Sequence, residues 1–289
     1  MKIFSLSGNP IFEVAEANLQ MANLRGANLQ EANLRGADLK GANLQGTNLQ
    51  RADLQEADLR GVSLQGVSLR GANLQRADLL GADLRRADIQ GADLQGANLQ
   101  MANLRGANLQ GTNFREANFR GANLRRANLK RANLQRVDLR GTDLQVVNLQ
   151  EADLRGADLR RADLKEADLQ ESNLEDVNFI GADLRHANLQ KVLLRKTNLQ
   201  ETYIRGVNLR EAFFQTPIFR FDSGVWDVSF NGAILQIGCQ SYPLEAWEAF
   251  SDDQIQAMAE KALTFWKTHK TFLLGLARQL LKDRPYDQS

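Results

Sequence analysis

Few residues of this sequence could carry out chemistry: a single cysteine, Cys239, and two histidines, His186 and His269. Neither histidine has other ligands around it at the spacing of a metal site. A lone cysteine that follows Ile237 and Gly238 is more often a small buried hydrophobic residue than a reactive thiol. The sequence contains no glycine-rich phosphate loop, no nucleophile elbow and no convergent acid–base pair. We therefore expect no enzymatic activity, no cofactor and no metal.

Basic side chains offer the other chemistry, because they recur along the chain at multiples of twenty residues. A chain that coils with that period would align them on one wall, as a docking face for an acidic protein partner. The alternative is a solvated surface, in which neighbouring Asp residues such as Asp83, Asp143, Asp163 and Asp183 pair with the cations. Each exposed pair of this kind contributes about 0–1 kcal/mol. The candidate wall consists of Arg25, Arg85, Arg86, Arg105, Arg125, Arg126, Lys165, Arg185 and Arg205.

A five-residue repeat sets these positions, and it runs from Ala17 to Thr216 without interruption. Each unit has a small residue, then Asn or Asp, then a larger apolar residue and two variable positions, as in residues 22–26 (ANLRG). The central apolar residue is Leu in 34 of the 40 units, and Asn or Asp precedes it in 35. Repeats of this regularity determine the fold before local propensity does.

A period of five fits neither a helix, with its period of 3.6, nor a flat strand, with its period of two. We therefore expect each unit to form one side of a square coil, with Leu and the small residue inside. Four sides give about twenty residues per coil, and stacked coils would lie about 4.8 Å apart. The sequence thus predicts a β-solenoid of about ten coils. Asn and Asp side chains would hydrogen-bond to the neighbouring backbone at the turns and would stack on one another from coil to coil. Gly would occupy corners where the backbone needs an unusual φ.

The repeat resembles the pentapeptide-repeat family, whose pattern is A-(D/N)-L-x-x. The resemblance covers residues 17–216 and implies an all-β solenoid, a right-handed quadrilateral β-helix. Family membership implies little about activity, and no catalytic residues belong to the motif. We therefore expect a non-enzymatic scaffold or regulator that presents flat walls for protein–protein interaction. Residues 237–239, with Trp247 and Trp266, are faintly similar to a module behind such repeats in phage-related proteins, and that similarity implies no activity.

A second function, from a different class, is inhibition or protection of a DNA-acting enzyme. Some pentapeptide proteins resemble B-form DNA in shape and negative charge and bind DNA gyrase. Residues 17–216 carry 28 Lys or Arg against 24 Asp or Glu, whereas a mimic that competes for a basic groove should be strongly negative. The repeats also lack the long loops of some gyrase-protecting relatives. DNA mimicry is therefore disfavoured, and without exposed aromatic residues beside the cations we expect no nucleic-acid partner.

The limits of the repeat divide the chain into an N-terminal cap at residues 1–16, the solenoid at 17–216 and a C-terminal domain at 217–289. An open coil end exposes unpaired backbone and Leu, so solenoids need caps; a short recruiting motif is the alternative for the first segment. Leu193 and Phe213 replace Asn or Asp twenty residues apart and should stack on one wall. We expect the C-terminal domain to dock on them, and a contact with another molecule is the alternative.

The C-terminal domain should be α+β and begin with a β-hairpin. Residues 225–230 alternate between apolar and polar, Asn231 and Gly232 form a strong turn signal, and residues 233–237 would be the return strand. About seventy residues are few for an independent core. The domain should therefore cap the C-terminal end of the solenoid.

Helices should follow the hairpin. Pro243 would open a short helix through Phe250. Ser251 and Gln254 form a capping box, which predicts one long amphipathic helix that continues to about Lys282. A deep pocket in this domain would support a ligand-binding role, and the residues expected to line it are Cys239, Tyr242 and Trp247.

The bulk composition indicates no partner, because 36 basic residues are balanced by 35 acidic ones. The N-terminus lacks the pattern of a secretory signal, and no apolar run approaches the eighteen residues of a membrane span. A single cysteine is compatible with a reducing compartment. We therefore expect a cytoplasmic protein without a membrane segment. A C-terminal lid would block one end of the solenoid and favour a monomer or a weak dimer.

Overall fold

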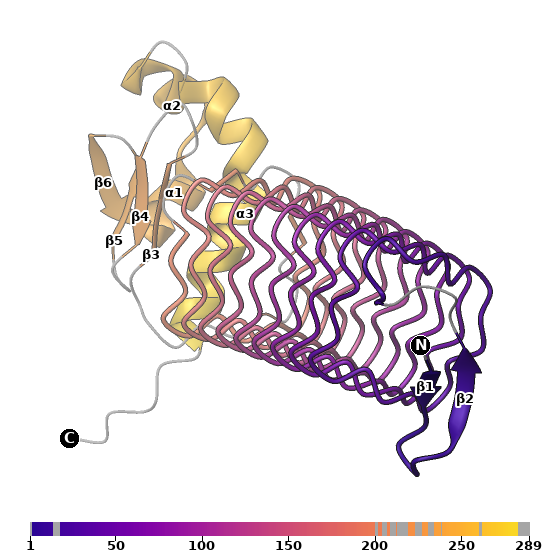
Figure 1. The fold of residues 1–289 in the computed structure, drawn as a ribbon. Coiled ribbons are helices and arrows are strands. Elements are labelled where there is room, and N and C mark those ends of the chain that lie inside the picture. Colours follow the sequence, from indigo (N-terminus) through magenta and orange to yellow (C-terminus); the bar gives the residue numbers. More distant parts are fainter. Residues whose placement is uncertain are drawn as a thin grey trace.

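The computed structural model describes residues 2–13, 18–199, 202–203, 207–208, 212, 219–222, 227–230, 234–237, 239–259 and 262–282. Figure 1 shows a long rod of stacked coils, with a small hairpin at its N-terminal end and a group of strands and helices at its C-terminal end.

The rod is a quadrilateral β-helix with twenty residues per coil. Parallel bridges join each residue before the central Leu to its counterpart twenty residues later, beginning with Asn23–Asn43 and continuing to Asn188–Asn208. A bridge occurs at every fifth position, so each coil has four sides. The period and the four-sided coil agree with the prediction from the repeat.

Backbone hydrogen bonds hold each side to the next coil. On one side, Leu24 N donates to Asn43 O at 2.9 Å and Gly26 N donates to Gln45 O at 3.0 Å. In the opposite direction, Asn43 N donates to Ala22 O at 3.0 Å. Because these bonds repeat along the rod, the backbone of one coil is the template for the next.

The interior holds the two apolar residues of each unit. Leu side chains such as Leu124 are fully buried, and so are the Ala residues two positions earlier. Phe114 and Phe119 replace Leu on successive sides and meet edge to face, with ring centroids 4.9 Å apart. Thr112 takes the place of Ala, and its buried Oγ1 donates to Ile89 O at 2.8 Å, so its hydroxyl is satisfied.

The corners need a left-handed residue. Ala27 N donates to Leu24 O at 3.0 Å, which closes a four-residue turn. Its third residue, Gly26, has φ +68°, as a type II turn requires. The same corner position elsewhere is often not glycine; Arg126, for example, has φ +59°. The expectation that corners need an unusual φ is confirmed.

The N-terminal segment forms a hairpin of β1 (Lys2–Phe4) and β2 (Pro10–Glu13). It pairs with the first coil, because Asn33 N donates to Phe4 O and Leu6 N donates to Glu31 O, both at 2.8 Å. Later coils satisfy the equivalent N–H from the preceding coil, as when Asp53 N donates to Ala32 O at 2.9 Å. Among the described residues no earlier coil lies before the first one, so the hairpin supplies the carbonyl that accepts the hydrogen bond from Asn33 N.

The C-terminal elements include a four-stranded antiparallel sheet, with strand order β3-β4-β5-β6. β4 (Asp227–Phe230) and β5 (Ile234–Ile237) occupy the expected hairpin strands. β3 (Phe219–Asp222) and β6 (Gln240–Pro243) extend the sheet on either side, and neither was predicted from the sequence.

Three helices follow: α1 (Leu244–Ala249), α2 (Asp252–Met258) and α3 (Ala262–Lys282). The predicted capping box is present, with Gln254 N donating to Ser251 Oγ at 3.3 Å and Ser251 N donating to Gln254 Oε1 at 2.9 Å. The prediction of one long helix from this cap is wrong. Ala259 has φ −169° and ψ 160°, so the chain leaves the helix there. With the break, Ile255 and Met258 of α2 and Trp266 of α3 line one cavity together with Trp247.

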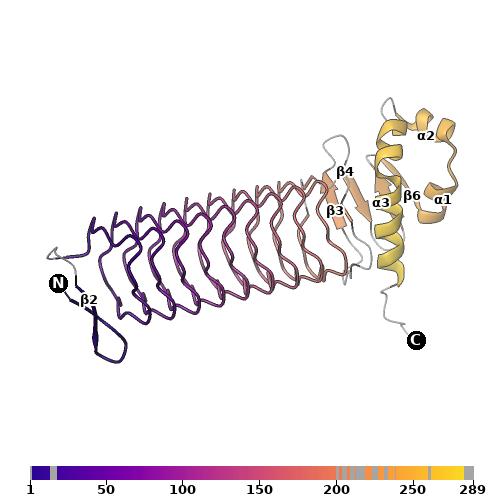
Figure 2. The ribbon, with the colours of Figure 1, turned by 90° about the vertical axis from the view of Figure 1, so that its right-hand side faces the viewer.

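Figure 2 shows these elements beyond the last coil, at the opposite end of the rod from the N-terminal hairpin, with α3 standing across the rod axis. The buried apolar residues form one cluster that extends from Ile3 to Ala277. Within the part of the chain that the structure describes, no helix is both long and apolar enough to cross a membrane.

Candidate interaction surface

The outward side chains are fixed in position by a turn that Asn or Asp forms with the backbone two residues later. Arg105 N donates to Asn103 Oδ1 at 3.2 Å, and Arg125 N donates to Asn123 Oδ1 at 3.0 Å. The same bond recurs along the rod, so each wall is a stiff row of similar turns. The residue that follows the central Leu therefore always points outward at a set place.

Asn side chains also bond between coils. Asn128 Nδ2 donates to Asn108 Oδ1 at 3.3 Å, and Asn133 Nδ2 donates to Asn113 Oδ1 at 3.1 Å. Where the earlier residue is Asp, the amide donates to the carboxylate instead, as Asn113 does to Asp93 at 2.9 Å. The predicted ladders are present, and in these bonds the later coil donates to the earlier one. Where the earlier residue is Asp, the amide must be the donor, because a carboxylate has none.

Where the residue before the central Leu is Asp, its carboxylate forms an ion pair with the basic residue that follows the Leu. Arg85 Nε donates to Asp83 Oδ1 at 2.8 Å and Arg85 Nη2 donates to Asp83 Oδ2 at 2.6 Å, which is a bidentate pair. The hydrogen bond from Arg85 lowers the pKa of Asp83 and raises the pKa of Arg85. The two charges largely cancel, so Arg85 offers a partner less than its formal charge suggests.

The basic wall is neutralised in the same way near its C-terminal end. Lys165 Nζ lies 3.1 Å from Asp163 Oδ2 and 3.2 Å from Asp183 Oδ2. Arg185 Nη2 lies 2.7 Å from Asp183 Oδ2. Burial raises the pKa of Asp183, but hydrogen bonds from Arg185 and Lys165 outweigh it and the net pKa is lowered. This part of the wall therefore fits the alternative interpretation, in which the basic residues belong to a solvated surface of paired charges.

Cations that follow Asn are different, because an amide cannot neutralise them. Arg25 and Arg105 are exposed, and among the described residues neither has a carboxylate partner. Arg125 is half-buried, and its Nε is buried without a hydrogen-bond partner. Arg86 and Arg126, also part of the predicted wall, are exposed corner residues with φ +57° and +59°, each one position after the column of Arg85, Arg105 and Arg125. Apart from Arg25, the unpaired cations of the predicted wall that the structure describes therefore lie on three successive coils.

Three of these cations, Arg86, Arg105 and Arg126, line a hollow of about 360 Å³ on the outside of the rod. We name it the basic hollow, and its lining residues are Gln65, Arg85, Arg86, Arg105, Gly106 and Arg126. The structure thus brings together four of the nine predicted wall residues. Arg25, Lys165 and Arg185 lie on other coils, and Arg205 lies outside the described residues.

The predicted docking pair is only partly described. Leu193 is half-buried and bridges to Asn173 on the preceding coil, while Phe213 lies outside the described residues. Docking of the C-terminal domain on this pair therefore stays a prediction.

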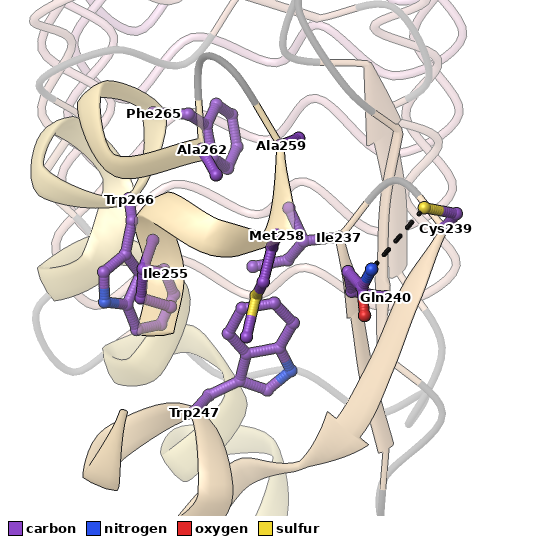
Figure 3. A pocket seen from close by; sticks show the side chains of 10 residues that line it. All are labelled: Ile237, Cys239, Gln240, Trp247, Ile255, Met258, Ala259, Ala262, Phe265 and Trp266. Carbon is purple, nitrogen blue, oxygen red and sulfur yellow. Dashed lines mark hydrogen bonds between the residues drawn. The ribbon is translucent and has the colours of Figure 1, made fainter. Parts of the chain in front are cut away.

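The C-terminal domain has a separate cavity of about 50 Å³ (Figure 3). It lies between α2, α3 and the sheet, and Trp247, Met258 and Trp266 are among its walls. Cys239 is at its edge beside Gln240, and it is exposed; the prediction that it is buried is wrong. It lies in the turn before β6, which carries it out of the core despite its apolar neighbours.

This cavity differs from the predicted pocket. Cys239 and Trp247 line it, but Tyr242 does not and instead meets Trp247 edge to face at 5.6 Å. A volume near 50 Å³ is far below the roughly 300–1,000 Å³ of ordinary small-molecule sites.

His269 packs against a neighbouring aromatic residue, because its ring stacks on that of Phe265 with centroids 4.4 Å apart. The described residues contain no group of three or more potential metal ligands.

The sequence placed the cations on one wall and predicted that neighbouring Asp residues pair with them, as Asp83, Asp163 and Asp183 do with Arg85, Lys165 and Arg185. It did not predict which cations are left without a carboxylate. The signal was available in the sequence: an Arg two residues after Asp pairs with that Asp, as Arg140 does with Asp138. An Arg two residues after Asn has no such partner in its own unit and is paired only where another carboxylate lies nearby, as Glu116 does beside Arg115. The hollow was not predicted either, and it depends on the glycine at position 106 between two corner arginines.

The fold and this surface define a β-helical repeat protein with five-residue sides and outward rows of varied polar residues. The pentapeptide repeat model matches residues 17–100, 102–141 and 142–215. The chain belongs to the pentapeptide repeat family, whose members fold as right-handed quadrilateral β-helices.

Several solved structures are similar to this chain. HetL, a pentapeptide repeat protein involved in heterocyst differentiation regulation from the cyanobacterium Nostoc sp. strain PCC 7120, is 34% identical over 68% of this chain and 89% of its own, with a TM-score of 0.29. Full-length QnrB1, a plasmid-mediated fluoroquinolone resistance protein, is 22% identical over 68% of this chain and 93% of its own, with a TM-score of 0.38.

Rfr23 from the cyanobacterium Cyanothece 51142 is 21% identical over 51% of this chain and 64% of its own, with a TM-score of 0.18. TM-scores this low carry no argument from superposition, so the family assignment rests on the repeat sequence. No curated protein matches the chain.

Proposed function

We propose that this protein is a non-enzymatic interaction scaffold or regulator, whose flat walls bind an acidic protein partner. The observation that carries the proposal is the set of unpaired cations Arg86, Arg105 and Arg126 around the basic hollow. A stiff wall holds these side chains at fixed places, so little backbone ordering is needed when a partner binds. The C-terminal domain is the second candidate source of specificity, because its sequence departs from the repeat.

The family comparison supports this proposal only in outline. HetL is described as involved in regulation, which fits a protein that acts through partners. The likeness to QnrB1 is below 25% identity and speaks for the fold alone. The alternative of DNA mimicry is disfavoured by the excess of basic residues in the repeats, 28 against 24 acidic. A strongly negative wall would be needed to compete for a basic groove.

Affinity capture from extract of the native host tests the proposal with three full-length baits. The first is the wild type, and the second carries Arg86→Glu, Arg105→Glu and Arg126→Glu. The third is a matched control with Arg76→Glu, Arg120→Glu and Arg161→Glu, exposed residues dispersed over the rod with the same change in net charge.

A partner bound by the wild type and the control but lost by the second bait supports the basic wall as the binding surface. Equal capture by all three baits would contradict that assignment and direct attention to the C-terminal domain. If none of the three baits enriches any protein, the interaction role itself loses its support.

A further inference from the structure

The basic hollow exists because a glycine separates two long corner side chains. Arg86, Gly106 and Arg126 occupy the same corner on three successive coils, which lie about 4.8 Å apart. A Cβ at position 106 would lie 4.0 Å from Arg86 Cγ, so any larger side chain there would occupy the space between the two arginines. The hollow is therefore walled by arginine on both sides and open to solvent.

The charge of the hollow is unbalanced. Its lining contains four arginines and no carboxylate residue. Asp83 neutralises Arg85 from outside the lining, and Arg86, Arg105 and Arg126 have no carboxylate partner among the described residues. Arginines held close together repel one another unless an anion lies between them. An anion is therefore the ligand that this arrangement favours.

A second hollow on the rod provides an internal comparison. It has a volume of about 290 Å³, and again a corner glycine, Gly156, lies between longer side chains of neighbouring coils, here Arg136 and Asp176. Its lining includes Glu175 and Asp176, which offset its cations. The repeat therefore produces such hollows by its geometry, and of these two the basic hollow is the one without acidic residues in its lining.

We propose that the basic hollow binds a compact oligophosphate anion, either inorganic or the phosphate end of a small ligand. The planar guanidinium fork matches phosphate oxygens in pairs, and three unpaired forks on three coils suit an ion with several charges in a short length. The volume of about 360 Å³ is at the small end of ligand sites. The lining has no aromatic residue that would hold a base, so recognition would be confined to the phosphates.

An acidic peptide segment fits the hollow less well. Side chains on one face of an extended strand recur about every 6.6–6.8 Å, whereas the coils recur about every 4.8 Å, so a carboxylate row loses register with the arginines. The corner arginines also enclose the hollow on two sides, which favours a compact ion over a chain that passes through. This inference goes beyond the proposed function and is tested separately from it, because binding of a protein to the wall does not require that the hollow bind phosphate.

Isothermal titration of the full-length protein with inorganic tripolyphosphate tests the proposal, with inorganic phosphate and an octa-aspartate peptide as comparison ligands. One variant carries Arg86→Gln and Arg126→Gln, and a second carries Gly106→Asn, since Asn tolerates a positive φ and would fill the hollow. The matched control carries Arg136→Gln and Lys196→Gln at the second hollow. Circular dichroism melting verifies that each variant is folded.

We expect tripolyphosphate to bind the wild type more than about tenfold tighter than inorganic phosphate. Both variants of the basic hollow should lose at least about tenfold in affinity, the loss expected when charge-assisted bonds are removed, while the control stays within about twofold.

Binding of tripolyphosphate weaker than about 1 mM would overturn the proposal, and so would an equal loss in the control. Tighter binding of the peptide would also overturn it and would assign the hollow to an acidic partner segment. If tripolyphosphate binds but the affinity capture recovers no partner, the scaffold role is contradicted and the anion site is still supported.

Discussion

Arg85 is clamped by the carboxylate of Asp83, whereas Arg105, one coil further on in the same column, follows Asn103 and has no such partner among the described residues. The choice between Asp and Asn two residues earlier thus decides whether an arginine on this wall is paired or free to bind a partner. The surface charge pattern depends on pairs of residues and cannot be read from the arginines alone.

The first prediction follows from this pair. Asn103→Asp should capture Arg105 as Asp83 captures Arg85, because the new carboxylate lies two residues before the arginine. We expect the affinity of the basic hollow for tripolyphosphate to fall by about threefold to tenfold, while stability changes by less than about 0.5 kcal/mol, as for most surface substitutions. Isothermal titration and thermal melting measure the two quantities. Asn133→Asp, which precedes Gln135, is the control, and a similar loss there would show a general charge effect instead.

The second prediction concerns the amide ladder. Asn113 accepts hydrogen bonds from Arg115 N at 3.2 Å and Asn133 Nδ2 at 3.1 Å, and it donates to Asp93 Oδ1 at 2.9 Å. Asn113→Ala removes all three, so we expect a loss of about 1–3 kcal/mol in unfolding free energy. Urea denaturation measures it.

Asn118→Ala provides the comparison on the next side of the coil. Asn118 accepts from Arg120 N at 3.0 Å and takes part in fewer side-chain bonds. Its loss should be smaller than that of Asn113→Ala. Equal losses from the two variants would indicate that the turn bond, rather than the ladder, supplies the stability.

The third prediction compares two glycines. Gly111 has φ +65° and an added Cβ would meet nothing within 4 Å, so Gly111→Ala isolates the cost of the left-handed corner. We expect a destabilisation of about 1–2 kcal/mol. Gly275 is exposed in the middle of α3 and also has free space, so Gly275→Ala should stabilise by about 0.5–1 kcal/mol. Thermal melting should give opposite signs, and a shift of the same sign in both would refute the corner argument.

The fourth prediction concerns acid. Side-chain hydrogen bonds from the arginines two residues later lower the pKa of Asp58, Asp83 and Asp138. A carboxylate with a depressed folded-state pKa contributes stability that is fully present above its unfolded value of about 3.9 and is lost as the pH falls through the folded value. We expect the Tm to stay level from about pH 7 to pH 5 and to decline below about pH 4.

Asp138→Asn tests the source of this decline. It removes the carboxylate that binds Arg140, so the Tm should fall less steeply with acid than in the wild type. Asp143→Asn is the control, because its Oδ1 accepts from Gln145 N instead of pairing with an arginine two residues later. An unchanged acid slope in Asp138→Asn would exclude these pairs as the cause.

The sequence by itself determined the coil. A period of five with Leu at every central position can bury its apolar residues only if the chain turns after each unit, and forty units leave no other register. The corner φ, the turns at Asn and Asp and the ladders then follow from local chemistry, which the sequence contains. The capping box at Ser251 belongs to the same class, because both of its bonds lie within four residues.

Only the tertiary structure decided the features that depend on contacts between distant residues. The long helix breaks at Ala259 although neither Gly nor Pro stands there, and Cys239 is exposed because of the turn that carries it. The basic hollow likewise needs Arg86, Gly106 and Arg126 on three coils, and it needs Asn rather than Asp beneath Arg105. A repeat fixes where each side chain stands, and an Asp two residues earlier fixes whether an arginine is paired within its own unit. Which of the open arginines meet around one hollow depends on the stacking of the coils.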